Sequence, residues 1–249
     1  MRPWLDPVLD LLFPAVCPVC GTRSDDRRRR PFCTACWDAL PLLPEPGCPV
    51  CGRVFVGLPA GLRCDACRRA PPPFGYARAV AAYRDGMRAA IHVLKYRGRR
   101  AVAPPLGALL AQVGRRLLPS PPEGRADELA VDAIVPVPLH GARLAERGFN
   151  QAELLAAPVA AAWQRPLLTR ALVRTRPTAP QTELDAMARR QNVTGAFAVA
   201  RPAEVAGLRL LLIDDVLTTG ATVSAAARAL RQGGAASVGV LVLAAVDAG

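Results

Sequence analysis

One stretch of the chain constrains the fold more than any other. Residues 210–222 run Leu-Leu-Leu-Ile-Asp-Asp-Val-Leu-Thr-Thr-Gly-Ala-Thr. The apolar residues predict a buried β-strand that ends in two adjacent carboxylates, Asp214 and Asp215. A hydroxyl-rich turn follows, and an alanine-rich segment then predicts a helix over 221–232. This order of strand, acids, turn and helix is typical of α/β domains, which bind ligands at the carboxyl ends of their strands.

The turn has the chemistry to bind a ribose phosphate. Backbone amides at a helix amino terminus point toward a dianion, and the threonine hydroxyls of the turn donate to its oxygens. Gly220 permits a close approach of the backbone. Asp214 and Asp215 accept hydrogen bonds from vicinal ribose hydroxyls. The alternative is a structural turn in which Asp215 caps the helix, but two buried acids without a ligand are costly.

Strand and helix signals alternate over the remainder of the chain. Strands are predicted at 76–83, 133–137, 196–200, 209–213 and 238–246. Helices are predicted at 85–96, 104–118, 150–163 and 221–232. The last strands are almost entirely apolar, as strands covered by helices on both faces must be. The pattern predicts an open α/β domain with a parallel sheet.

The cysteines divide the chain. All 8 lie in C-x-x-C pairs near the amino terminus: Cys17 and Cys20, Cys33 and Cys36, Cys48 and Cys51, Cys64 and Cys67. Each pair presents two thiolates to one tetrahedral ion. The sequence Cys-Pro-Val-Cys-Gly occurs at 17–21 and again at 48–52, which indicates an internal duplication.

Three interpretations of these pairs compete. The amino terminus lacks the features of a secretion signal, which argues against a disulfide framework. The pairs follow no βαβ pattern, which argues against redox motifs. Two structural zinc sites remain, and pairing by proximity assigns residues 17–36 to one ion and 48–67 to the other. A cross-braced pairing stays open.

The cysteine segment contains too few apolar residues for a core of its own, so metal must supply much of its folding free energy. Ala-Pro-Pro-Pro at 70–73 predicts a stiff linker. We therefore expect a double zinc-ribbon module at 13–70 and an α/β domain at 74–249.

The formal net charge of +12 fits a phosphate-bearing partner, and a generic basic surface remains an equal alternative. No apolar stretch approaches the roughly 18 residues needed to span a bilayer. We expect a soluble, cytoplasmic protein.

Residues 210–222 match, at every defining position, the 5-phosphoribosyl-1-pyrophosphate (PRPP) motif of type I phosphoribosyltransferases. The wider pattern resembles the ComF family, which includes competence proteins required for DNA uptake. It consists of 135–138, 147–151, Arg176, Thr178, Gln181, Leu184, Arg189 and Asn192, together with the cysteine module. The resemblance implies a type I phosphoribosyltransferase fold, an open, mostly parallel sheet with a hood, preceded by the zinc ribbons.

The resemblance also implies a set of site residues. Asp214, Asp215, Arg176 and Arg189 would be catalytic, with the two arginines on a flexible loop at 174–192. Mg²⁺ would be chelated by the pyrophosphate of PRPP. The remaining binding residues are Val216, Leu217, Thr218, Thr219, Gly220, Ala221 and Thr222 in the motif, Pro138, Leu139 and His140 in a pyrophosphate loop at 136–141, and Arg147, Asn150, Gln151 and Gln181.

Three of the polar residues also have structural interpretations. Asn150 equally fits a helix amino-terminal cap. His140 is interpreted as a surface-loop residue, with a phosphate contact as the alternative. Lys95 is interpreted as a surface side chain, with a position at the site as the alternative.

Two functions from different classes follow. In the first, the protein transfers phosphoribose from PRPP to an unidentified acceptor and releases pyrophosphate. In the second, it senses PRPP or a nucleotide without catalysis. Its zinc module then binds single-stranded DNA or a DNA-uptake partner such as a helicase.

Overall fold

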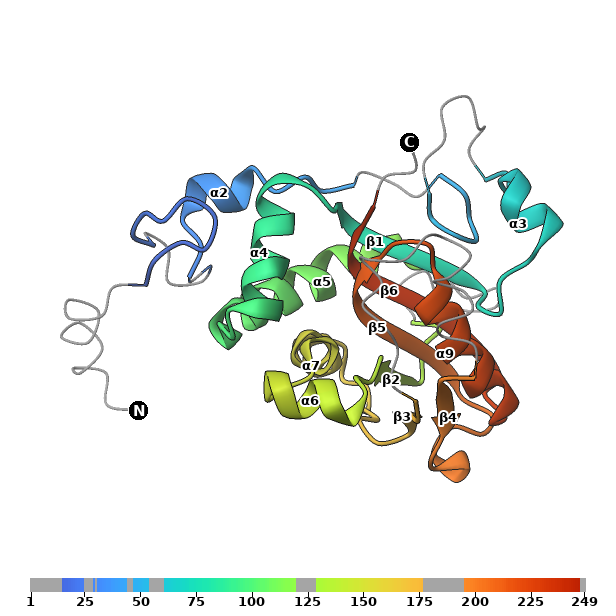
Figure 1. Ribbon diagram of the computed structural model, residues 1–249. Helices are drawn as coiled ribbons and strands as arrows, with labels where there is room; N and C mark the ends of the chain where they lie inside the picture. The colour runs from blue at the N-terminus through green and yellow to red at the C-terminus, as the bar shows by residue number, and fades with distance from the viewer. Residues whose placement is uncertain are drawn as a thin grey trace.

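The structure is a computed structural model that describes residues 15–24, 29, 31–43, 47–53, 61–119, 129–176 and 195–246. Figure 1 shows an α/β sheet domain with cysteine-containing segments beside it. Its helices are α2 (Thr34–Asp38), α3 (Asp65–Arg69), α4 (Asp85–Tyr96), α5 (Ala103–Leu117), α6 (Gly141–Arg147), α7 (Gln151–Trp163) and α9 (Ala221–Gln232). Its strands are β1 (Tyr76–Ala82), β2 (Ala133–Pro136), β3 (Leu172–Arg174), β4 (Phe197–Val199), β5 (Arg209–Leu217) and β6 (Ser237–Ala245).

The main sheet has the order β1-β6-β5-β2, and every neighbouring pair is parallel. Ile213 of β5 stands opposite Pro136, the last residue of β2. The strand expected at 209–213 is longer than predicted, because β5 continues to Leu217 and includes Asp214 and Asp215. The two acids therefore lie beside the carboxyl end of β2, the end of the strands at which open parallel sheets bind ligands.

The apolar residues of the central strands alternate between two cores. Leu211 and Ile213 of β5 pack with α4, α5 and α7, whereas Leu210 and Leu212 pack with α9 and the pair β3–β4. Burial on both faces explains why β5 and β6 are nearly continuous apolar runs. Gly107 lets α5 approach α7 closely, because a Cβ at this position would lie 2.7 Å from the Cγ of Pro158. Within the described ranges, no helix is long and apolar enough to cross a membrane.

The predicted parallel sheet is confirmed, with one correction. The strand expected at 196–200 exists as β4, but it pairs antiparallel with β3 outside the main sheet. The short β3 and α6 were not predicted, because elements of three and seven residues carry too little periodicity. By contrast, α4 and α9 have the predicted bounds.

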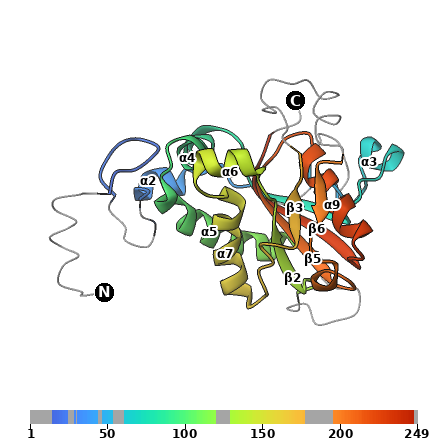
Figure 2. The same cartoon turned by 60° about the horizontal axis from the view of Figure 1, so that its bottom comes forward.

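The cysteine segments pack on the edge strand β1. Leu43 N–H donates to Val80 O at 2.9 Å, and Ala77 N–H donates to Val50 O at 2.7 Å. Figures 1 and 2 place α2 and α3 on opposite sides of the sheet domain. Leu42 and Leu43, after the first cluster, and Val50, in the second, thus lie along β1 and cover parts of a strand edge that would otherwise be open. The boundary between modules expected at 70–74 stays a prediction.

Candidate functional site

The eight cysteines form two clusters. Cys17, Cys20, Cys33 and Cys36 make the first, and Cys48, Cys51, Cys64 and Cys67 make the second. The thiols are free, and within each cluster the Sγ atoms lie within 4.8 Å of one another. The Sγ atoms of Cys20 and Cys33 are 3.6 Å apart, and those of Cys51 and Cys64 are 3.8 Å apart. A tetrahedron with Zn–S bonds of about 2.3 Å has edges of about 3.8 Å, so both clusters fit zinc. The sequential pairing is confirmed.

The two carboxylates expected at the site are buried near the carboxyl end of β5. Asp214 is 8% exposed and Asp215 is 3% exposed. The backbone N–H of Asp215 donates to Asp214 Oδ1 at 2.9 Å, which fixes the orientation of the first carboxylate. Two adjacent buried acids need a compensating positive charge or a proton.

Lys95 supplies the positive charge, and its interpretation as a surface residue is wrong. Its Nζ lies 2.8 Å from Asp215 Oδ2, with side-chain exposures of 19% and 5%. Burial alone would lower the pKa of Lys95, but attraction to Asp215 and Asp214 outweighs burial and raises it. Lys95 is the only lysine in the chain, and that was the one signal in the sequence for a special role.

Asp214 is stabilised as a neutral acid. Burial raises its pKa to about 8, repulsion from Asp215 adds to the shift, and attraction to Lys95 opposes it. A neutral Asp214 beside the ion pair of Lys95 and Asp215 leaves these three side chains with little net charge.

This raised pKa predicts a pH dependence of stability. The folded state binds a proton at Asp214 that the unfolded chain, with an ordinary pKa of about 3.9, has already released. The contribution of Asp214 to the free energy of unfolding is fully present below pH 4 and is lost as the pH rises to about 8. Asp214→Asn should therefore gain stability relative to wild type over this range, by up to about 1.4 kcal/mol per pH unit.

Urea unfolding of both proteins at pH 5, 6.5 and 8 measures the difference in unfolding free energy, in which titrating groups that do not interact with Asp214 cancel. A difference in unfolding free energy that stays constant with pH would contradict the raised pKa.

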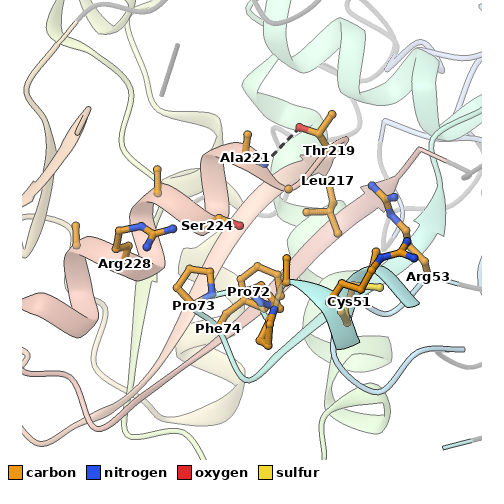
Figure 3. A pocket seen from close by; sticks show the side chains of 18 of the residues that line it. Cys51, Arg53, Pro72, Pro73, Phe74, Leu217, Thr219, Ala221, Ser224 and Arg228 are labelled. Carbon is orange, nitrogen blue, oxygen red and sulfur yellow. Dashed lines mark hydrogen bonds between the residues drawn. The ribbon is translucent and has the colours of Figure 1, made fainter. Parts of the chain in front are cut away.

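The turn after β5 has the expected conformation. We call residues 218–222 the ligand loop. Gly220 has φ +82°, a left-handed conformation that glycine adopts without strain, and it directly precedes α9. Thr219 Oγ1 accepts from Ala221 N–H at 3.4 Å. A cavity of about 640 Å³ borders the loop at Thr219, Gly220 and Ala221 (Figure 3). The two carboxylates are not among the residues that line it.

The pyrophosphate-loop candidate begins beside the carboxylates. Val137 N–H donates to Ile213 O at 2.9 Å, immediately before Asp214. His140 Nδ1 accepts from Ala142 N–H at 3.3 Å and so caps α6. Asn150 caps α7 through Ala152 N–H, and its Nδ2 donates to Val137 O at 3.1 Å. The capping interpretation of Asn150 is thus confirmed, and its side chain also holds the loop.

Two arginines of the expected site, Arg147 and Arg174, lie in different surroundings. Arg147 donates to Gln151 Oε1 at 2.6 Å and lies 5.7 Å from the ring centroid of Tyr96. Arg174, expected at the start of a flexible loop, belongs to β3 and is half-buried. Burial lowers the pKa of Arg174, Arg143 adds to this effect, and Asp214 opposes it. Arg174 is thus an additional cation in the electrostatic environment of Asp214.

The other predicted residues differ in how far the structure places them. Arg176 is described and exposed, whereas Gln181 and Arg189 lie outside the described residues. Pro138 and Leu139 are partly buried between β2 and α6. The roles assigned to these residues, and to the ligand loop, stay predictions.

Two family models match the chain. One describes a double zinc ribbon domain and matches residues 8–68. The other describes a phosphoribosyl transferase domain and matches residues 125–249. The two cysteine clusters are accordingly the structural zinc sites of a double ribbon.

Curated relatives match different shares of the chain. The DNA utilization protein YhgH of Salmonella typhi is 38% identical over 79% of this chain and 82% of its own length. Competence protein F of Haemophilus influenzae is 39% identical over 45% of this chain and 50% of its own length. Competence protein ComFC of Bacillus subtilis is 29% identical over 85% of this chain and 82% of its own length. A solved Bacillus subtilis glutamine PRPP amidotransferase is 22% identical, with a TM-score of 0.37 over 57% of this chain and 26% of that chain. With its double zinc ribbon and its phosphoribosyltransferase domain, the chain belongs to the ComF-like group of the phosphoribosyltransferase superfamily.

Proposed function

We propose that the protein binds PRPP with Mg²⁺ at the end of β5 and transfers its phosphoribosyl group to a nitrogen nucleophile. The observation that carries this proposal is the placement of Asp214 and Asp215, which are buried near the carboxyl end of β5, a few residues before the glycine turn that starts α9. Carboxylates accept from ribose hydroxyls, and amides of the turn and of the first turn of α9 donate to the 5′-phosphate.

The residues present fit a metal that arrives with the substrate. Carboxylate oxygens suit Mg²⁺. Asp215 is already paired with Lys95, so Asp214, which would have to release its proton, is the ligand that this pair would offer. When bound to pyrophosphate, Mg²⁺ neutralises charge and improves the leaving group. Lys95 and Asp215 hold each other in place beside the ribose, and the segment after β2 borders the pyrophosphate.

The chemistry balances without an oxidant or reductant. The anomeric C–O bond breaks, and its electron pair leaves with pyrophosphate. The nitrogen lone pair of the acceptor forms the new C–N bond, and the acceptor then loses a proton to solvent. The carboxylate of Asp215 and, once it has released its proton, that of Asp214 would stabilise the developing oxocarbenium ion.

The names of the relatives extend the proposal to a role. Several are DNA utilization or competence proteins, and we infer that this chain serves the handling of DNA taken up by its host. Its net charge of +12 is compatible with a nucleic-acid partner.

Thermal unfolding with PRPP, with and without Mg²⁺, tests the proposal, with pyrophosphate measured in the same samples. At a hundredfold excess over Kd, the ligand should stabilise the protein by about 2.7 kcal/mol. Thr219→Phe should abolish this stabilisation, because the larger ring blocks the loop. Thr169→Phe, at an exposed position in another turn, is the matched control and should retain it.

The outcomes separate binding from catalysis. Stabilisation with pyrophosphate release would support a transferase and justify an acceptor screen. Stabilisation without release in any acceptor mixture would favour a sensor. A wild-type protein that PRPP does not stabilise would contradict the proposed function.

A further inference from the structure

The second zinc cluster is joined tightly to the sheet. We call residues 48–53 the second knuckle. Within it, Cys48 N–H donates to Arg53 O at 2.9 Å, and Val50 O accepts from Ala77 N–H of β1 at 2.7 Å. A Cβ on Gly52 would lie 2.4 Å from Ala77 O, so the knuckle lies directly against the strand backbone. The position of Arg53 is therefore fixed relative to the sheet.

Arg53 connects this knuckle to the ligand loop. Its Nη2 donates to Thr218 O at 2.8 Å, a contact between residues 165 positions apart. Figure 3 shows Arg53 and Cys51 on the ribbon side of the cavity, with Thr219 and Ser224 on the α9 side.

The contact orients the peptide group between Thr218 and Thr219. Peptide groups are planar and trans, so the carbonyl of Thr218 and the N–H of Thr219 point in opposite directions. A guanidinium that holds the carbonyl therefore directs the N–H of Thr219 away from the zinc ribbon. This N–H belongs to the set of backbone donors that would bind a phosphate.

The internal duplication shows that the knuckle does not need an arginine here. In the first knuckle, residues 17–22, Cys17 N–H donates to Thr22 O at 2.7 Å, as Cys48 N–H does to Arg53 O. Gly21 N–H donates to Cys17 O at 3.0 Å, as Gly52 N–H does to Cys48 O at 2.9 Å. Threonine thus occupies the position equivalent to Arg53 and closes the same turn. The arginine side chain is free to serve another purpose.

We propose that Arg53 is a positioning residue that links the second Cys₄ cluster to the ligand loop, so that metal in this cluster and a phosphorylated ligand in the loop stabilise each other. The inference rests on the proposed function and goes beyond it, because it gives one zinc ribbon a part in ligand binding. Coupling between two binding sites is reciprocal. Ligand should therefore slow the loss of zinc from the second cluster.

The first experiment compares Arg53→Thr with wild type in the full-length, zinc-loaded protein. The variant should retain two equivalents of zinc and the unfolding temperature of the unliganded protein, because threonine closes the same turn in the first knuckle. Its Kd for PRPP with Mg²⁺ should rise about tenfold, the effect of losing one hydrogen bond to a charged group. Arg69→Thr removes the same charge from the wall of the same cavity and should leave the Kd unchanged.

The second experiment measures zinc release to a chromogenic chelator. In wild type, PRPP with Mg²⁺ should slow the release of one equivalent of two, and in Arg53→Thr this protection should disappear. A purely structural role for Arg53 would not move this ligand-linked rate.

Several results would overturn the inference. These are an unchanged Kd in Arg53→Thr, an equal loss of affinity in Arg69→Thr, and ligand protection of zinc that persists in Arg53→Thr. If PRPP does not stabilise the wild type, the proposed function fails and the inference fails with it. If PRPP stabilises both wild type and Arg53→Thr with one Kd, only the inference fails.

Discussion

Replacing Lys95 with methionine is expected to lower the free energy of unfolding by about 3–5 kcal/mol, because it leaves Asp215 buried without its partner. Lys95 Nζ and Asp215 Oδ2 are 2.8 Å apart, and the side chain of Asp215 is only 5% exposed, so solvent screens the interaction little. Denaturant unfolding near pH 7 measures the effect directly. Restoring the neutrality of the site should recover much of the loss. The double variant Lys95→Met/Asp215→Asn should therefore be more stable than Lys95→Met alone.

Arg88→Met is the matched control for this change. Arg88 lies on the exposed side of the same helix, α4, so the variant removes one positive charge without touching Asp215. Its expected effect is within about 0.5 kcal/mol. Equal losses in Lys95→Met and Arg88→Met would show that the Lys95–Asp215 pair contributes nothing to stability.

Replacing both Cys48 and Cys51 with serine is expected to remove one of two zinc equivalents and to destabilise the protein by several kcal/mol. The binding free energy of a structural zinc is about 10–16 kcal/mol, which sets an upper bound on the loss. The consequence should extend beyond the ribbon, because the second knuckle is hydrogen-bonded to β1 through Val50 and Ala77. Metal analysis and thermal unfolding measure the two effects.

Cys17→Ser/Cys20→Ser is the matched variant in the first cluster. It should also lose one zinc equivalent, but the residues whose packing it disturbs should belong to a different core. Cys17 packs with Met87 and the α4 side of the sheet, whereas Cys48, Cys64 and Cys67 form a small cluster of their own. A metal content of two in either variant would contradict the assignment of the four ligands.

Most of the features that depend on residues close together in the sequence could be predicted from it. The spacing of the cysteines specified two four-thiolate sites, and proximity gave their pairing correctly. The bounds of α4 and α9 followed from apolar periodicity and from flanking polar residues. The strand, acid pair and glycine turn around 210–222 were predicted as a unit, since their signal lies within one short stretch.

Contacts between residues far apart in the sequence could not be predicted from it. Lys95 has a long apolar stem, and nothing in its helix shows whether its ammonium group reaches solvent or a buried carboxylate. The pairing of β3 with β4 depends on the path of the chain between them, which local propensity does not specify.

The sequence by itself therefore determined the two zinc sites, the α/β class of the sheet domain and the position of the acidic motif at the end of a strand. Only the tertiary structure decided what surrounds that motif. It brought Lys95 to Asp215, Arg53 to Thr218 and the cysteine segments to the edge of β1. The physical reason is that a periodic or spaced pattern encodes contacts between near neighbours, whereas charge compensation in a buried site depends on which distant segments fold against it.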